Sequence, residues 1–223
     1  MTDTTTADTF SQHSSLNQSA HPAQSGQLAQ PTKAHTARRA MIDSQLRTSG
    51  VNEPFVLARM SAVAREDFVP EAARDTAYID RSIPLANGRR LAAPLFYGMI
   101  LAEAQPGLSD TALVVDSGSG YLPELLRPLV GSLDVITPED AAAETASPAR
   151  YSLVLVDGAV EELPDTLAQR MDDGARILTG LVTNGVTKLA VGRKSTSGIG
   201  LLALAEMGIP RLSEFDKTTG WSF

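Results

Sequence analysis

The spacing of apolar positions changes about halfway along the chain. Between residues 38 and 104, apolar residues recur at helical spacing in three segments, residues 38–47, 55–63 and 94–104. From residue 111 onward, short continuous apolar runs alternate with helical patterns, and turn residues follow several of the runs. Such runs are typical of strands buried on both faces. The pattern therefore predicts an α/β fold with a mostly parallel sheet and helices on both of its faces.

Six apolar runs are candidate strands of this sheet. They are residues 111–115, 133–136, 153–156, 175–181, 187–192 and 201–206, and residues 218–223 form a further candidate edge strand. The segments between them predict helices over residues 121–130 and 162–170. The helical pattern before residue 107 predicts a separate N-terminal helical subdomain.

Polar composition sets the first residues apart from this pattern. Residues 1–37 are rich in Thr, Ser, Gln and Ala and contain few large apolar side chains, so we expect a disordered tail. The expected organisation is a tail over residues 1–37, a helical subdomain over 38–107 and a domain with the α/β pattern over 108–223. No segment has the pattern of a secretory signal or a membrane span, and the expected location is the cytoplasm.

Composition restricts the chemistry further. The chain has no cysteine, and its three histidines, His13, His21 and His35, all lie in the predicted tail. A Ser-His-Asp triad, a Cys-His pair and a metal held by His or Cys are therefore excluded from the body, and we expect no metal. A net charge of −7 and a pI of about 5.0 provide no overall basic field, so nucleic acid and anionic membranes are not expected partners.

A glycine-containing turn follows the first predicted strand. It reads Asp116-Ser117-Gly118-Ser119-Gly120 and precedes a predicted helix. A turn of this kind offers backbone N–H groups and a helix N-terminus to a ligand at the carboxyl edge of a parallel sheet. Tight strand–helix packing explains the same residues equally well.

Motifs across residues 38–223 resemble those of the protein-L-isoaspartate (D-aspartate) O-methyltransferase family. The most specific stretches are Met41–Arg47, Arg65–Glu71, Ala77–Asp80 and Ile83–Leu85, and Tyr121 after the turn also matches. The resemblance implies a Rossmann-like class I methyltransferase sheet that uses S-adenosylmethionine. It also implies methylation of the carboxylate of isoaspartyl residues in damaged proteins, after which the ester collapses to a succinimide.

The family's substrate turn, Ser-Gln-Pro or Ser-Ala-Pro, corresponds here to Ala92-Ala93-Pro94. The resemblance therefore implies substrate contacts at Ala92, Ala93 and Pro94. The hydroxyl that contacts the isoaspartyl carboxylate in the family is absent, because Ala92 stands in place of its serine.

The family's cofactor positions are also altered. The resemblance implies cofactor contacts at Asp116, Ser117, Gly118, Gly120, Tyr121, Thr137 and Asp157. Asp116 replaces a glycine, so its charge either faces the cationic end of a ligand, blocks the pocket or caps the next helix. Thr137 stands where the family has the acid that binds the ribose, and Glu139 or Asp140 substitutes for it if the register is shifted.

The connection after the second predicted strand is short. Only ten residues separate Asp140 from Tyr151, whereas the family's helix and third strand there need roughly 30. We therefore expect six strands, with one strand–helix unit lost.

Two main functional hypotheses remain open. The first is a divergent methyltransferase that acts on isoaspartyl residues in proteins or peptides with S-adenosylmethionine. The alternative is a non-catalytic relative, a pseudoenzyme, that binds a protein partner or another small ligand. A third reading is a nucleotide or dinucleotide binder that uses Gly118 and Gly120.

Overall fold

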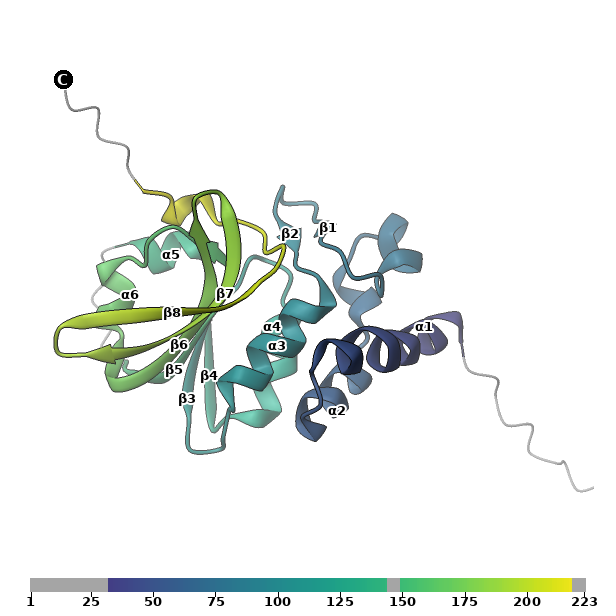
Figure 1. Cartoon of the computed structure of the whole chain (residues 1–223), viewed down its shortest axis with the longest axis horizontal. Helices are drawn as coiled ribbons and strands as arrows, with labels where there is room; N and C mark the ends of the chain where they lie inside the picture. Colours follow the sequence, from purple (N-terminus) through teal and green to yellow (C-terminus); the bar gives the residue numbers. More distant parts are fainter. Residues whose placement is uncertain (1–31, 144–148, 218–223) are drawn as a thin grey trace, which may run out of the picture. The chain divides into compact units, whose positions relative to one another are not determined.

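A six-stranded sheet is the largest element of the structure, a computed structural model that describes residues 32–143 and 149–217 (Figure 1). The strand order is β4-β3-β5-β6-β7-β8, parallel from β4 to β6 and antiparallel from β6 to β8. The six strands confirm the number expected from the short connection after Asp140. The candidate strand at residues 218–223 and the predicted tail up to residue 31 lie outside the described residues.

The strands follow the apolar runs, and most extend beyond them. The bounds are β3 Thr111–Val115, β4 Ser132–Ile136, β5 Tyr151–Val160, β6 Met171–Thr183, β7 Val186–Ser195 and β8 Gly198–Glu206. Asn184 and Gly185, both with positive φ, form the two-residue turn between β6 and β7. A separate two-stranded ribbon joins β1 Ile83–Pro84 to β2 Arg90–Leu91.

The part of the chain that the structure describes also contains six α-helices and several single turns. The α-helices are α1 Lys33–Met41, α2 Pro54–Ala62, α3 Pro94–Ala104, α4 Tyr121–Leu126, α5 Pro138–Ala142 and α6 Asp165–Gln169. The π-helix η1 spans Ile42–Leu46, and the 3₁₀ turns are η2 Arg47–Ser49, η3 Arg65–Phe68, η4 Glu71–Thr76, η5 Arg127–Leu129 and η6 Ser213–Phe215. The predicted helix over 121–130 ends its α-helical part at Leu126, since Pro128 cannot donate to the helical ladder.

Helix α1 begins at Lys33, so the tail boundary expected at residue 37 falls inside it. The Thr32 side chain caps this helix by accepting from the His35 N–H (3.2 Å). Ala34 and Ala37 pack against the hydrophobic core, which ties the start of the helix to the rest of the fold.

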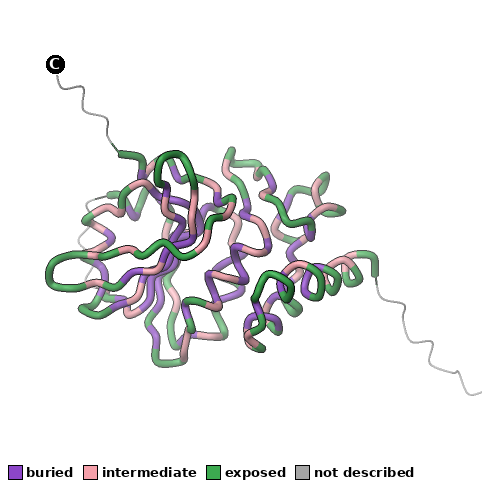
Figure 2. The backbone as a smooth tube through the Cα atoms, viewed as in Figure 1, coloured by how far each residue is buried: buried purple, intermediate pink, exposed green. Residues whose placement is uncertain are grey.

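Each face of the sheet carries its own hydrophobic cluster. Side chains alternate along β3, so Ala112 and Val114 pack with α2, α3 and α4, whereas Leu113 and Val115 pack with α5 and α6. Burial is concentrated in the central strands and α3, while β8 is exposed along most of its length (Figure 2). The front helices share the first cluster with the sheet, so residues 38–107 and 108–217 contribute to one continuous core.

The C-terminal segment before residue 217 closes over the end of β5. Ala159 donates its N–H to Pro210 O (2.7 Å), and Leu212 donates to Ala159 O (2.9 Å). The end of β5, which extends beyond the predicted residues 153–156, thus pairs both with β6 and with this segment. It also brings η6 to the carboxyl edge of the parallel strands.

Candidate active site at the carboxyl edge of the sheet

A cavity of about 670 Å³ lies where β3 and β4 end. Four segments line it: the loop after β1, the turn after β3, the start of α5 and the segment before and within η6. Its residues are Asn87–Arg90, Asp116–Gly118, Thr137–Glu139 and Pro210–Glu214. Ligands of open α/β sheets bind at this edge, so this cavity, which includes part of the glycine-containing turn, is the candidate site.

Asp116 organises the glycine-containing turn. Its carboxylate accepts the N–H of Gly118 (2.9 Å to Oδ2) and the N–H of Gly120 (3.1 Å to Oδ2). Gly118 and Gly120 have φ of +96° and +72°, which favours glycine at both positions. Burial raises the pKa of Asp116, and the two N–H groups and Arg89 oppose that rise. The contacts of Asp116 close the turn before α4 and do not cap the helix, because both donors precede its first residue, Tyr121.

Asp157, in β5, anchors this turn through a hydrogen bond to Ser117. The carboxylate is almost fully buried and accepts hydrogen bonds from Ser117 Oγ (2.9 Å) and Tyr97 Oη (2.9 Å). Burial raises the pKa of Asp157 to about 7, and the charge of Asp116 adds to the rise. The Ser117 hydroxyl is therefore turned toward Asp157, and the turn is anchored on both sides by carboxylates.

Thr137 begins α5 and serves as its cap. Its hydroxyl oxygen accepts the Asp140 N–H (3.2 Å). Of the two acids that could replace the family's ribose-binding carboxylate, Glu139 lines the cavity and Asp140 does not.

Arg89 crosses the cavity mouth and joins segments that are far apart in sequence. Its guanidinium donates to Glu214 (Nη2 to Oε1, 3.1 Å) and forms an ion pair with Glu139. The neighbouring Asn87 donates to Ser117 O (3.4 Å), so this loop lies against the glycine turn. Sequence reasoning missed Asn87, Arg89 and Glu214, and the only available signal was an Asn-Gly turn followed by two arginines.

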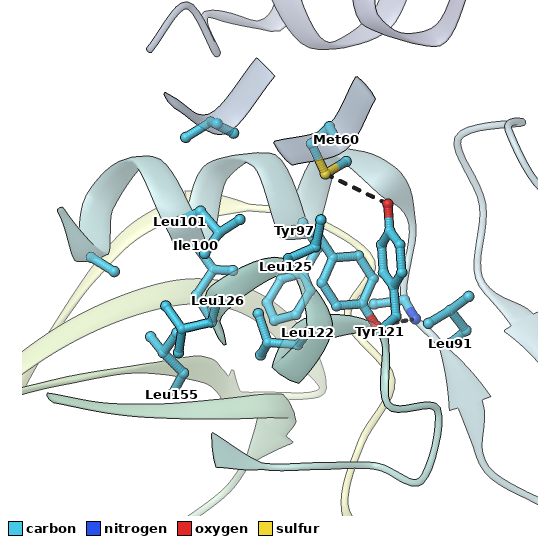
Figure 3. Close-up of a cluster of buried hydrophobic side chains, with 14 of the residues drawn as sticks. Met60, Leu91, Tyr97, Ile100, Leu101, Tyr121, Leu122, Leu125, Leu126 and Leu155 are labelled. Atoms are coloured by element: carbon cyan, nitrogen blue, oxygen red, sulfur yellow. Dashed lines mark hydrogen bonds between the residues drawn. The ribbon is translucent and has the colours of Figure 1, made fainter. Parts of the chain in front are cut away.

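Tyr121 and Ala92 are core residues rather than cavity residues. The Tyr121 ring packs edge-on against Tyr97, with centroids 5.0 Å apart, and its hydroxyl donates to Met60 Sδ (3.6 Å) (Figure 3). Ala92 is buried, and its carbonyl accepts a hydrogen bond from the fully buried Arg65 (Nη2, 2.5 Å). The structure thus gathers Asp116, Ser117, Gly118 and Thr137 at the cavity.

The remaining predicted positions do not line this cavity. Gly120 is the N-cap residue of α4, and Pro94 is the first residue of α3. Ala93 lines a second, smaller cavity that adjoins the first. Of the three residues expected to contact substrate, only Ala93 faces a cavity among those described here.

Comparison with known proteins identifies the family. The family model for protein-L-isoaspartate(D-aspartate) O-methyltransferase matches residues 36–147, half of the chain. The chain belongs to this family. Besides the front helices, the match covers the β1–β2 region, the glycine turn and the start of α5, and these last three segments supply most of the residues that line the cavity.

Two relatives show how far the similarity reaches. Protein-L-isoaspartate O-methyltransferase 1 of Rhodopseudomonas palustris (strain HaA2) is 33% identical over 116 residues, 52% of this chain and 47% of that protein. The chain therefore aligns with about half the length of this relative. The corresponding protein of Herpetosiphon aurantiacus is 28% identical over 167 residues, 63% of this chain and 74% of that protein.

A solved structure shares the fold. A Plasmodium falciparum protein described as a β-aspartate methyltransferase (PCMT), in complex with S-adenosyl-L-homocysteine, has a TM-score of 0.63 at 17% identity. The superposition covers 82% of this chain and 99% of that chain. The likeness confirms the family's Rossmann-like methyltransferase fold.

Two features are absent from the described residues, a membrane-spanning helix and a cluster of metal ligands. Within residues 32–143 and 149–217, no helix is long and apolar enough to cross a membrane. In the same ranges, no three acidic or histidine side chains gather as ligands for a metal ion.

Proposed function

We propose that this chain transfers a methyl group from S-adenosylmethionine to the carboxylate of isoaspartyl residues in proteins. The observation that carries the proposal is the cavity at the ends of β3 and β4, in a chain of the protein-L-isoaspartate(D-aspartate) O-methyltransferase family. This is the edge of the sheet at which open α/β folds bind nucleotide-like ligands.

The lining of the cavity suits a cofactor of this kind. About 670 Å³ lies within the range of pockets that hold ligands of nucleoside size. Glu139 supplies a carboxylate for ribose hydroxyls. Arg89 places a guanidinium on the lining, which matches a ligand that carries a carboxylate.

Bound there, S-adenosylmethionine would supply an electrophilic methyl group on a positively charged sulfur. The protein's own contribution is to hold the acceptor carboxylate in line with that group and to exclude water. A carboxylate with an ordinary pKa near 4 is already ionised at neutral pH, so the chain needs no general base. The chemistry is therefore compatible with a body, residues 38–223, that has neither histidine nor cysteine.

Calorimetric titration with S-adenosylhomocysteine tests the cofactor half of the proposal. We expect micromolar binding, and about tenfold weaker binding by Glu139→Gln, which removes a charged hydrogen-bond partner. Glu103→Gln is the matched control, because Glu103 is an exposed acid on α3 that does not line the cavity. No binding at millimolar ligand would overturn the proposal and leave the non-catalytic reading.

A peptide assay tests the reaction half. The chain should transfer labelled methyl groups to a peptide with one isoaspartyl residue, and the ester should release methanol. The same peptide with a normal aspartyl residue should not be labelled. Equal labelling of both peptides would contradict the proposed substrate.

A further inference from the structure

A second cavity adjoins the first along one wall. It encloses about 360 Å³ beside the start of α3. Arg90 and Pro210 line both cavities, so the two spaces share a boundary at these residues. A molecule in the second cavity therefore lies next to whatever occupies the first.

The second cavity combines an apolar wall with guanidinium groups. Its apolar side chains come from α3 and from the segment after β8, and its charged side chains come from the β1–β2 region. The lining consists of Asp80–Ser82, Arg90, Ala93, Leu95, Phe96 and Met207–Pro210. Asp80 is engaged locally, because its Oδ1 accepts the Leu95 N–H (3.2 Å) in the first turn of α3. Two arginines against one engaged carboxylate favour an anionic ligand.

Arg90 is held in place by one residue on one side only. Its Nε donates to Ser82 Oγ (2.9 Å), and its Nη2 donates to Ser82 O (3.1 Å). Within the described ranges, no carboxylate lies within ion-pair distance of Arg90, whereas the neighbouring Arg89 pairs with two glutamates. Arg90 is thus a positioned guanidinium with donors left for a ligand.

We propose that Arg90 binds the substrate's isoaspartyl carboxylate in this second cavity, at its boundary with the first. This inference rests on the proposed function, because it names how that same site takes its substrate. Ala92 has no hydroxyl for the task and is buried, with its carbonyl already bonded to Arg65. A guanidinium at the boundary of the cofactor cavity takes over the contact that the family's serine makes. The apolar wall receives the flanking peptide.

Methylation removes the negative charge of the substrate carboxylate, and this weakens its interaction with Arg90. The substrate carboxylate is an anion, whereas the methyl ester is neutral and forms only weak hydrogen bonds with a guanidinium. Binding through Arg90 therefore favours substrate over product, and it assists release of the ester.

Peptide binding without cofactor tests this inference. Two labelled peptides are compared by fluorescence anisotropy: one has an isoaspartyl residue, and the other has the same residue with its free carboxylate converted to carboxamide. The chain should bind the carboxylate peptide about 10- to 100-fold more tightly. Arg90→Gln should lose this discrimination, and Arg90→Lys should keep part of it. Arg127→Gln is the control, since Arg127 is exposed beyond α4 and lines neither cavity.

The outcomes separate this inference from the proposed function. Equal binding of the two peptides, or undiminished discrimination by Arg90→Gln, overturns the role of Arg90 even if methyl transfer is found. Discrimination that depends on Arg90, in a chain that does not bind S-adenosylhomocysteine, supports the carboxylate site and overturns only the methyl transfer. Thermal melting of each variant confirms that the exposed substitutions leave the fold intact.

Discussion

Asp116 occupies backbone donors that the glycine turn would otherwise present to a ligand. The N–H groups of Gly118 and Gly120 both donate to its carboxylate. In the family pattern a glycine stands at this position, and it has no side chain to accept them. Asp116→Gly should therefore free both donors, raise the affinity for S-adenosylhomocysteine and lower the stability of the chain.

The structure sets the size of both effects. Loss of the hydrogen bonds that close the turn costs about 0.5–2 kcal/mol, and a new flexible glycine costs roughly 0.5–1 kcal/mol more. The unfolding free energy should therefore fall by about 1–3 kcal/mol. Two freed N–H groups, each worth about 0.5–1.5 kcal/mol to an uncharged acceptor, should strengthen ligand binding by roughly 5- to 100-fold.

Calorimetry and urea denaturation of three variants measure these effects. Asp116→Asn separates charge from occupancy, because the amide oxygen still accepts one N–H while the charge is gone. We expect its ligand affinity to lie between those of the wild type and Asp116→Gly. Asp172→Gly is the control, because Asp172 is an exposed acid on β6 that does not line the cavity. It should leave the affinity for S-adenosylhomocysteine unchanged.

Two results would refute this reasoning. Ligand binding at least tenfold weaker in Asp116→Gly would show that the carboxylate itself contacts the ligand's cationic end. Unchanged stability in the same variant would show that the two hydrogen bonds do not stabilise the turn.

Three further variants test other parts of the site. Burial raises the pKa of Asp157 to about 7, so the folded chain keeps a proton that the unfolded chain releases near pH 4, and stability should fall as the pH rises between these values. Asp157→Asn should abolish this loss, up to about 4 kcal/mol between pH 4 and 8 by urea denaturation, and a wild type with flat stability would contradict it. Arg89→Ala should lower the unfolding free energy by about 1 kcal/mol or less, because the ion pair with Glu214 is partly exposed. The same variant should bind S-adenosylhomocysteine about tenfold more weakly by calorimetry. Gly118→Ala places a Cβ 2.4 Å from Asn87 Nδ2 at a φ of +96°, and should destabilise by about 1–3 kcal/mol in urea, whereas Gly107→Ala, with no atom nearer than 3.9 Å, should not.

The sequence alone was sufficient to predict the elements whose ends are marked by neighbouring residues. The predicted strand at residues 111–115 and the predicted helix at 94–104 match β3 and α3 at both ends. Apolar runs bounded by proline, glycine or aspartate define these segments without help from distant residues. The same argument explains why the turn at residues 116–120 was recognised.

Elements that depend on distant partners were not predictable in the same way. β5 reaches Val160 because its end pairs with Gly180 and Leu181 of β6, and residues 210–212, some 50 positions later in the chain, also bond to it. The start of α1 at Lys33 depends on small alanine side chains that pack on the core, in a stretch that is polar by composition. The sequence left three candidates after β4 for the position of the family's ribose-binding acid: Thr137, Glu139 and Asp140. Only the lining of the cavity distinguishes them, because it includes Thr137 and Glu139 but not Asp140.

The ionic contacts of the site show why its chemistry needed the tertiary structure. Arg89 and Glu214 are 125 positions apart, and no sequence periodicity links them. The second cavity likewise brings Arg90 beside the segment after β8. Arg89 stands in the loop between β1 and β2 and Arg90 begins the two-residue strand β2, where spacing carries little information about the direction of a side chain.

Polar groups around the first cavity are largely satisfied by one another. Asp116 takes the N–H groups of the turn, Thr137 caps α5, and Arg89 pairs with Glu139 and Glu214. A ligand that binds there must exchange these contacts for its own, so each new hydrogen bond contributes only its difference from the one it replaces. Affinity for the cofactor should therefore depend on how weakly these internal pairs are held rather than on the volume of the cavity. Arg90 is different, because its open donors gain a carboxylate without losing one.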